Sequence, residues 1–325
     1  MICLGIETTA HTFGIGIIDE KGRVVVNEKS VYVPKKGKGI LPREAASHHI
    51  ENSTEVLKNA LKKTNRKNID LIAVAAGPGL PPCLHVGLKL ARFLALKLKK
   101  PLVCVNHCIA HIEIGKLKTK CKDPIVVYLS GGNTQIIGYA DGRYRIFGET
   151  EDVPIGNALD TLARSLDLKI PGGPEIERCT KGGNYIELPY VVKGMDLSFT
   201  GLVTDVLKKY KSGSNVEDVC YSFQETSFAM LTEVTERALA HIDKNEVLLV
   251  GGVAVNKRLQ EMMSSMCGER SAKLYVVPNE YAGDNGINIA WAGILDYSHN
   301  KRNDISDSKI RQKWRTDEVS INWLD

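Results

Sequence analysis

An internal repeat of strands and polar turns constrains the fold of this chain more than any other feature. Apolar runs at residues 2–6 and 13–18 flank a small polar loop, and a turn containing Asp19 leads to a third run at 24–33, a pattern typical of strands. The same order returns 122 positions later, which aligns three identical pairs: Thr12 with Thr134, Gly16 with Gly138, and Asp19 with Asp141. This duplication predicts two related lobes, residues 1–123 and 124–325.

Apolar runs alternate with helical periodicity over the rest of the chain. We expect helices at 43–63, 84–98, 107–116, 155–167, 201–209, 216–242, 256–266 and 285–297, and further strands at 70–76, 102–105, 125–129, 135–140, 143–147, 246–250 and 272–276. Strands that alternate with helices indicate an α/β fold. We expect the Gly- and Pro-rich stretch 169–201 to be an insertion or active-site loop, and the polar tail after residue 299 to lie on the surface.

Composition narrows the class of protein. The chain has 43 Lys+Arg against 38 Asp+Glu, and this net charge of +5 permits a polyanionic partner without requiring one. No apolar run approaches 18 residues and the first residues lack a basic start, so we expect neither a membrane span nor a signal peptide. The eight cysteines are scattered without a C-x-x-C pair, which indicates free thiols in a reducing, cytoplasmic setting.

Basic residues gather in five short clusters, at 35–38, 62–67, 97–100, 116–122 and 208–211. Most such clusters are solvated faces of the protein. One of them could contact a nucleic acid.

Glycine-containing loops follow three of the expected strands. Ser130-Gly131-Gly132-Asn133-Thr134 could form a nest of backbone N–H groups for an anion, and glycines let a phosphate come close. Gly251-Gly252 joins a strand to a helix start, a second possible nucleotide site, but it is not the Rossmann G-x-G-x-x-G. Each loop could also be an ordinary turn. For Gly77-Pro78-Gly79 a structural strand-to-helix turn is the favoured interpretation.

His107 and His111 form the pattern in the chain that most strongly suggests a metal or catalytic site. Residues four apart on a helix share one face, so both imidazoles could bind one metal ion, although two purely structural histidines would give the same spacing. Asp284, before a helix, is a candidate third ligand, and its alternative role is an N-cap. Cys108 stands where a zincin protease needs Glu, and the chain has neither a G-x-S-x-G elbow nor a Walker A lysine motif.

Taken together, these motifs resemble the Kae/TsaD/OSGEP family of tRNA threonylcarbamoyl transferases, once described as O-sialoglycoprotein endopeptidases. The resemblance spans nearly the whole chain in matching order and is carried by residues 6–12, 42–45, 77–80, 107–111, 130–135, 196–201, 251–254 and 284–286. Residues 79–87 and 315–319 are similar to the archaeal and eukaryotic branch, which works within the KEOPS complex. Because no kinase domain follows, we do not expect the fused transferase–kinase form.

The resemblance implies the duplicated two-lobe actin-like, sugar-kinase and heat-shock ATPase (ASKHA) fold. It implies one divalent metal, with Fe²⁺ as the first candidate and Zn²⁺ as the alternative. The implied ligands are His107, His111 and Asp284, with Tyr128 as a further ligand. It also implies that an adenylate or ATP/ADP is bound by Tyr128, Leu129, Ser130, Gly131, Gly132, Asp160, Gly173, Glu177 and Asn256. The carboxylates of Asp160 and Glu177 would suit ribose hydroxyls.

Three positions depart from the family pattern. Ser47 stands where many relatives have Arg, and Ala282 where Cys is frequent. The first polar loop, residues 7–12, is the counterpart of the loop at 130–134 in the other lobe and is expected to grip a phosphate as well. Thr8 replaces a frequent Gly there, which weakens this expectation. None of these changes removes an implied metal ligand.

The implied reaction transfers threonylcarbamoyl from threonylcarbamoyl-AMP to the N6 amine of the adenosine next to the anticodon in ANN-decoding tRNAs. AMP leaves readily from this mixed anhydride, a metal would polarise the carbamoyl carbonyl, and the backbone of residues 130–132 would stabilise the phosphate. Glu7 is the candidate general base, because the first hairpin of this fold faces the space between the lobes. The expected partners are tRNA and KEOPS subunits, including a small kinase-like ATPase and a small dimerising subunit that binds the N-terminal lobe. We expect those subunits to supply much of the tRNA-binding surface.

Other classes of function remain open from the residues alone. An ASKHA-type ATPase or sugar kinase fits the two lobes equally well but does not explain the histidine pair. A metalloprotease lacks the glutamate after His107. A nucleic-acid-binding or abasic-site protein would fit the mild basic charge.

Overall fold

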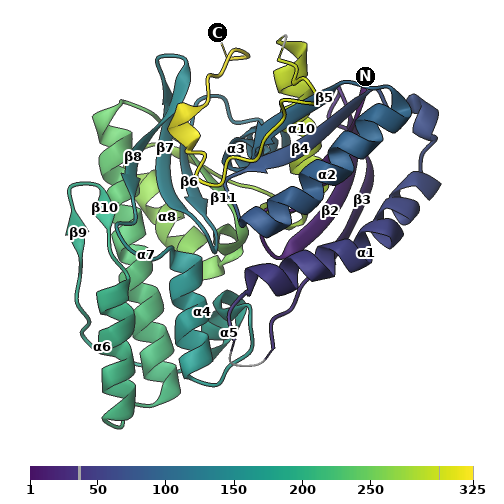
Figure 1. Ribbon diagram of the computed structural model, residues 1–325. Coiled ribbons are helices and arrows are strands. Elements are labelled where there is room, and N and C mark those ends of the chain that lie inside the picture. The colour runs from purple at the N-terminus through teal and green to yellow at the C-terminus, as the bar shows by residue number, and fades with distance from the viewer. Residues whose placement is uncertain (36–37, 300, 325) are drawn as a thin grey trace.

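Two five-stranded mixed sheets organise the computed structural model, which describes residues 1–35, 38–299 and 301–324 (Figure 1). The first sheet has the order β3-β2-β1-β4-β5, with β1 (Ile2–Glu7), β2 (Thr12–Asp19), β3 (Val24–Val31), β4 (Leu71–Gly77) and β5 (Leu102–Asn106). The second has the order β12-β11-β6-β7-β8, with β6 (Ile125–Leu129), β7 (Thr134–Ala140), β8 (Arg143–Glu149), β11 (Glu246–Val250) and β12 (Lys273–Val276).

The two sheets have the same topology. In each, the first strand pairs antiparallel with the next strand in sequence and parallel with a later one, β1 with β2 and β4, and β6 with β7 and β11. This repeated arrangement agrees with the duplication read from the sequence, and it confirms the α/β class. The division at residues 123 and 124 stays a prediction.

Helices cover both faces of each sheet. They are α1 (Pro42–Lys62), α2 (Pro81–Leu98), α3 (His107–Thr119), α4 (Ile155–Ser165), α5 (Gly172–Cys179), α6 (Thr200–Lys211), α7 (Val216–His241), α8 (Lys257–Glu269), α9 (Asn279–Ala282) and α10 (Gly286–Ser298). Helices α1 and α2 lie on one face of the first sheet and α10 on the other, while α3 contacts strands of both sheets. Short 3₁₀ turns occur at η1 (Arg66–Asn68), η2 (Gly252–Val255) and η3 (Thr316–Glu318).

Every predicted helix and strand is present, with ends that differ by at most three residues. The stretch 169–201 is not wholly a loop, because it contains α5 and a hairpin of β9 (Val192–Lys193) and β10 (Asp196–Leu197). Helix α5 starts with Gly172-Gly173-Pro174, so its sequence lacks strong helix formers where the helix begins. Part of the predicted basic cluster 35–38 lies outside the described residues.

Helix α10 begins directly on glycines of the first sheet. A Cβ added at Gly5 would lie 2.2 Å from the carbonyl oxygen of Gly286, and one added at Gly16 would lie 2.1 Å from the nitrogen of Ile287. Gly5 of β1 lies opposite Gly16 of β2, so neither strand has a side chain at this point. The start of α10 therefore approaches the sheet to backbone contact distance.

The tail after residue 299 lies on the surface only in part, because some of its residues are buried against both sheets. The backbone N–H of Arg311 donates to Ala76 O at the end of β4, while that of Ile321 donates to Gly142 O in the β7–β8 turn. Trp314 and Ile321 are only 6% and 1% exposed. The tail thus joins the two sheets through contacts that a polar composition does not reveal.

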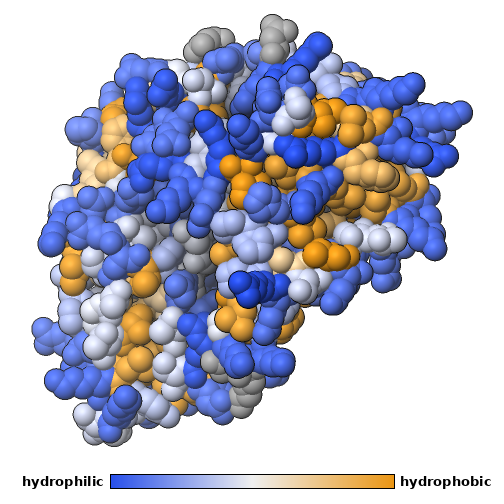
Figure 2. Space-filling view, viewed as in Figure 1, coloured by the Kyte–Doolittle hydropathy of each residue, from blue (hydrophilic) through white to orange (hydrophobic). Residues whose placement is uncertain are grey.

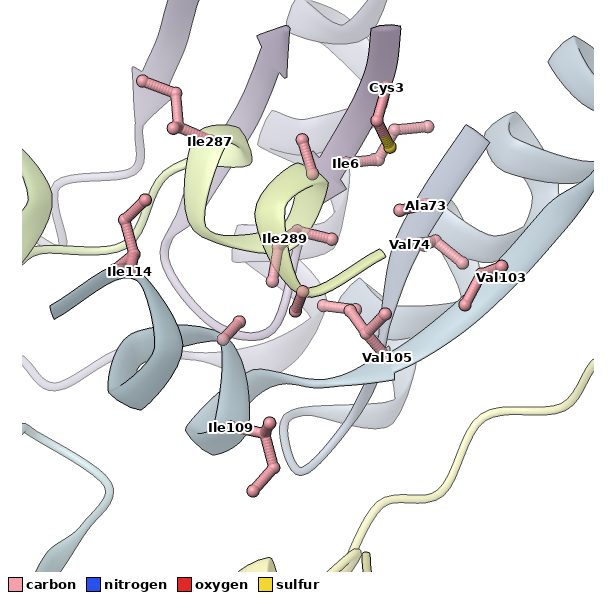
Figure 3. Packing of buried hydrophobic residues seen from close by; sticks show 14 of the residues in the cluster. Cys3, Ile6, Ala73, Val74, Val103, Val105, Ile109, Ile114, Ile287 and Ile289 are labelled. Carbon is pink, nitrogen blue, oxygen red and sulfur yellow. The ribbon is translucent and has the colours of Figure 1, made fainter. Parts of the chain in front are cut away.

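The larger core cluster lies on the first sheet and extends to α3 and α10. Figure 3 shows its side chains arriving from β1, β4, β5 and both helices, with Ile6, Val74, Val105, Ile109 and Ile289 among those labelled. A second cluster fills the space between the second sheet and helices α4 to α8. All eight cysteines are free thiols, as expected. Among the described residues, no helix combines the length and apolar character needed to cross a membrane.

Candidate functional site

The N-terminus of α3 presents the two histidines. Asn106, the last residue of β5, caps the helix, because its side-chain oxygen accepts hydrogen bonds from Cys108 N at 2.8 Å and Ile109 N at 3.2 Å. The helix therefore starts at His107, and the i, i+4 spacing brings the rings of His107 and His111 to 4.7 Å between centroids. Both side chains are buried.

Asp284 completes a compact cluster with these histidines. It lies between α9 and α10, and the N-cap of α10 is its neighbour Asn285, whose side chain accepts from Ile287 N and Asn288 N. Asp284 Oδ1 lies 3.5 Å from His107 Nε2 and 3.3 Å from His111 Nε2, and one ligand atom of each residue lies within 4.8 Å of the others. Because Asn285 does the capping, the carboxylate of Asp284 is free to face the imidazoles.

The charges in this cluster support one another. Burial disfavours a charged His107, but the carboxylates of Glu7 and Asp284 outweigh burial and raise its pKa to about 9. Burial lowers the pKa of His111, although the hydrogen bond that its ring makes to Asp284 opposes this shift. Burial alone would raise the pKa of Asp284, yet the two imidazoles hold it well below its usual range. The site therefore stabilises an ionised carboxylate beside cationic or metal-binding nitrogens.

Tyr128 contributes a buried hydroxyl from a ring that lies beside His111. It lies at the end of β6, is 0% exposed, and its ring centroid is 5.4 Å from that of His111. Within the described part of the chain, its hydroxyl makes no hydrogen bond. A buried polar atom without a partner is costly, so an ion coordinated here would satisfy a group that the protein leaves unpaired. Two imidazoles, a carboxylate and a phenol oxygen form a donor set that fits iron or zinc.

Glu7 lies beside the cluster, at the end of β1. Its Oε2 is 2.8 Å from His107 Nδ1, and its Oε1 accepts hydrogen bonds from Thr9 N and Thr9 Oγ1, both at 2.5 Å. The side chain is completely buried. The first polar loop therefore contacts α3 through this carboxylate.

The Ser130-Gly131-Gly132 loop follows directly from β6 and Tyr128. Ser130 Oγ accepts hydrogen bonds from Gly132 N at 3.3 Å and Asn133 N at 3.0 Å, so part of the predicted anion nest is satisfied within the loop. A Cβ added at Gly131 or Gly132 would meet nothing within 4 Å. The space above the two glycines is open, as a phosphate would need.

The remaining predicted nucleotide residues come from neighbouring helices of the second lobe. Asp160 in α4 accepts from Gly172 N, next to Gly173, at 2.6 Å. Glu177 in α5 accepts from Lys257 N at 2.8 Å, at the start of α8. These bonds connect α4, α5 and α8 around the glycine turn that follows β11.

Asn256 has a partly structural role. It caps α8 by accepting from Leu259 N, and its amide donates to Gln224 Oε1 at 3.0 Å. Gly251 has a positive φ of 93°, and a Cβ there would meet Leu129 O at 2.2 Å. This glycine is therefore required for the turn itself, rather than only for a ligand.

Sequence reasoning missed several supporting residues. Asn106 and Asn285 could have been found, because Asn before a helical run is an N-cap signal. No local pattern marks Thr9 as a partner of Glu7, because its contact depends on the conformation of the loop. The same holds for Thr316 of the tail, whose hydroxyl donates to Gln135 Oε1 at 3.1 Å.

Known proteins resemble this chain over its whole length. A "Probable bifunctional tRNA threonylcarbamoyladenosine biosynthesis protein" of Methanocaldococcus jannaschii is 51% identical over all of this chain, which spans 61% of that longer protein. The "tRNA N6-adenosine threonylcarbamoyltransferase" of Archaeoglobus fulgidus is 54% identical over 99% of this chain and 100% of its own length. That of Methanopyrus kandleri is 51% identical over 99% and 96%.

Solved structures with low identity support the fold. HypF of T. kodakarensis superposes with a TM-score of 0.63 at 17% identity, over 90% of this chain and 47% of that one. Component A of the Acidaminococcus fermentans (R)-2-hydroxyglutaryl-CoA dehydratase gives a TM-score of 0.57 at 12% identity, over 92% and 99%. These likenesses confirm the ASKHA fold expected from the sequence.

The family comparison agrees with the identification made from the motifs. The family model TsaD, described as "tRNA N6-adenosine threonylcarbamoyltransferase", matches residues 23–291. Together with relatives above 50% identity over nearly the full length, this confirms an enzyme of the transferase class. The chain belongs to the TsaD family of tRNA N6-adenosine threonylcarbamoyltransferases.

Proposed function

We propose that this protein transfers the threonylcarbamoyl group from threonylcarbamoyl-AMP to the N6 amine of the adenosine adjacent to the anticodon in ANN-decoding tRNAs. The observation that carries the proposal is the cluster of the buried His107 and His111 with the partly buried Asp284 in a chain of the TsaD family. This cluster lies next to Tyr128, where β6 leads into the open glycine loop. The candidate metal ligands and the open glycine loop are therefore connected through Tyr128 and the end of β6.

One divalent cation would be held by His107, His111 and Asp284, with Tyr128 as a further ligand. Fe²⁺ is the first candidate for this ion and Zn²⁺ the alternative. Such an ion would supply Lewis acidity for the carbamoyl carbonyl. The protein's own contribution is to bury the ligands and to orient them from separate elements: α3, β6 and the start of α10.

The adenylate would lie along the second lobe. Backbone groups of the segment from Leu129 to Gly132 would bind its phosphate and stabilise the charge that develops as AMP leaves. Within the described residues, hydrogen bonds occupy only Oδ1 of Asp160 and Oε1 of Glu177, so the second oxygen of each remains available for a ribose hydroxyl. Gly173 and Asn256 would border the nucleoside.

Protein partners would complete the tRNA-binding surface. We propose membership of a KEOPS-type assembly in the cytoplasm, with a small kinase-like ATPase and a small dimerising subunit on the N-terminal lobe. Large apolar side chains of α1 and α2 support the second partner, since Ile50, Phe93 and Leu96 are 62%, 58% and 64% exposed. Figure 2 shows apolar residues gathered on the side of the molecule where these helices lie. An exposed apolar face of this kind is typical of an interaction surface.

The test is a transfer assay with purified chain, candidate partner subunits, tRNA and preformed threonylcarbamoyl-adenylate. His107→Ala and His111→Ala should each abolish transfer, while His241→Ala, an exposed histidine at the end of α7, should not change it. Full transfer by both site variants would refute the metal role. ATP hydrolysis without tRNA, in place of transfer, would instead support the ATPase alternative.

A further inference from the structure

The carboxylate of Glu7 is fully committed to hydrogen bonds inside the protein. Its Oε1 accepts from both Thr9 N and Thr9 Oγ1, and its Oε2 faces His107 Nδ1. Glu7 is 0% exposed and His107 is 6% exposed, so water does not compete for these contacts. A general base must bring a free lone pair to the proton that it removes, and this geometry directs both oxygens elsewhere.

The contact with Glu7 determines which nitrogen of His107 faces the cluster. A carboxylate only accepts hydrogen bonds, so His107 Nδ1 must carry the proton that it donates to Oε2. The remaining nitrogen, Nε2, lies 3.5 Å from Asp284 Oδ1, on the side of the other ligands. A carboxylate behind a histidine in this way sets its tautomer and ring orientation and makes it a stronger metal ligand.

We propose that Glu7 is a positioning residue that orients His107 for metal binding, and that it is not the general base. The inference rests on the proposed metal site of His107, His111 and Asp284. It assigns to the first polar loop a role in holding a metal ligand, in place of the phosphate contact expected for that loop.

The loop that carries Glu7 is itself held in place. Thr9 O accepts a hydrogen bond from Leu80 N at 2.7 Å, at the start of α2. A Cβ added at Gly79 would lie 2.6 Å from the same oxygen, so only glycine permits this close approach. The support for His107 thus extends from α3 through Glu7 and Thr9 to α2.

Only a carboxylate can make all of these contacts at this position. Glutamine has the same shape, but one of its two terminal atoms is an amide nitrogen that donates. If that nitrogen faced Thr9, it would oppose the backbone N–H of Thr9, which can only donate. If it faced His107, it would oppose Nδ1–H and favour the wrong tautomer. Glu7→Gln should therefore disturb metal binding although it conserves volume.

The experiment measures Co²⁺ and Zn²⁺ affinity of the full chain by chelator competition, together with the absorption spectrum of the Co²⁺-loaded protein. Glu7→Gln should bind each metal 10- to 100-fold more weakly, the range found for residues that support metal ligands, with an altered Co²⁺ spectrum. Thr9→Val should show a smaller loss, because Thr9 N still donates to Oε1. The matched control is Glu113→Gln, a buried glutamate on α3 that accepts from Tyr144 at 2.6 Å and should leave the affinity unchanged.

The outcomes separate this inference from the proposed function. Wild-type affinity and spectrum in Glu7→Gln, with transfer lost, would overturn the inference and restore Glu7 as the base. Failure of the unmodified chain to bind either metal would refute the metal site itself, and the inference with it. If Glu7→Gln does not fold, Thr9→Val decides, and an unchanged affinity in that variant would count against the positioning role.

Discussion

Gly16→Ala tests whether the close approach of α10 to the first sheet sets the geometry of the proposed metal cluster. The new Cβ would lie 2.1 Å from Ile287 N and 2.3 Å from Gly286 C, whereas real Cβ contacts essentially never fall below 3.0 Å. Both atoms belong to backbone, so the first turn of α10 must withdraw by about 0.9 Å, the difference between 3.0 and 2.1 Å. Asp284 lies two residues before this helix and would move with it.

The expected cost is about 1–3 kcal/mol in the free energy of unfolding, the range typical of overpacking. Metal affinity should fall as well, because Asp284 Oδ1 would leave its position 3.3 Å from His111 Nε2, and ligand sites tolerate errors of only about 0.5 Å. Chemical denaturation of the metal-free chain and Zn²⁺ titration of the folded chain measure the two effects separately.

Gly138→Ala is the matched control, because Gly138 occupies the corresponding position in β7. Its Cβ would meet the side-chain ends Ile242 Cδ1 at 2.6 Å and Phe147 Cε2 at 2.9 Å, which can move aside. This variant should lose less stability and keep its metal affinity. If Gly16→Ala matches the unmodified chain in both stability and affinity, α10 does not depend on this contact and the reasoning is refuted.

Three further predictions follow from individual side chains. Burial lowers the pKa of His49 to about 4, so between pH 6.5 and 4 the unfolded chain binds more protons than the folded chain. The free energy of unfolding should therefore fall by up to about 3 kcal/mol as the pH falls through this range, and denaturation curves of His49→Gln should lack this pH dependence. Trp314→Ala should cost about 3–5 kcal/mol in chemical denaturation, since a surface tail would lose almost nothing. Asp284→Asn should abolish stoichiometric metal in elemental analysis while the chain still folds cooperatively, because Asn285 still caps α10; retained metal would exclude Asp284 as a ligand.

Local patterns predicted the elements of this fold well. The apolar runs at β1 and β6 and the turns at Asp19 and Asp141 mark strands because side-chain alternation and turn chemistry act over a few residues. Helix α5 was missed, since its first residues, Gly172-Gly173-Pro174, carry little helix propensity and tertiary contacts stabilise it instead. The buried part of the tail was missed for a related reason: the polar composition of the tail conceals Trp314, whose carbonyl accepts a hydrogen bond from Asn106, about two hundred residues earlier in the chain.

The candidate site was likewise predictable from the sequence only in part. The i, i+4 spacing of His107 and His111 follows from helical periodicity, so the sequence sufficed to put both rings on one face. The sequence also offered Asp284 as a candidate third ligand, which the family resemblance supported, and the structure brings it to 3.3 Å from His111 although 173 residues separate them. The role of Glu7 depends on which carboxylate faces which imidazole nitrogen. That pairing is set only when β1, α3 and the start of α10 come together in the fold.

By itself, the sequence determined the α/β class, the repeated strand order and the helix that carries the histidine pair, because these depend on interactions among neighbouring residues. The tertiary structure alone decided that α10 and the tail return to the first sheet, that Asn285 caps α10 in place of Asp284, and that Glu7 faces His107. Such contacts join residues that are distant in the chain. Their distances depend on packing of the whole fold, to which backbone contacts at Gly5 and Gly16 contribute as much as any side chain.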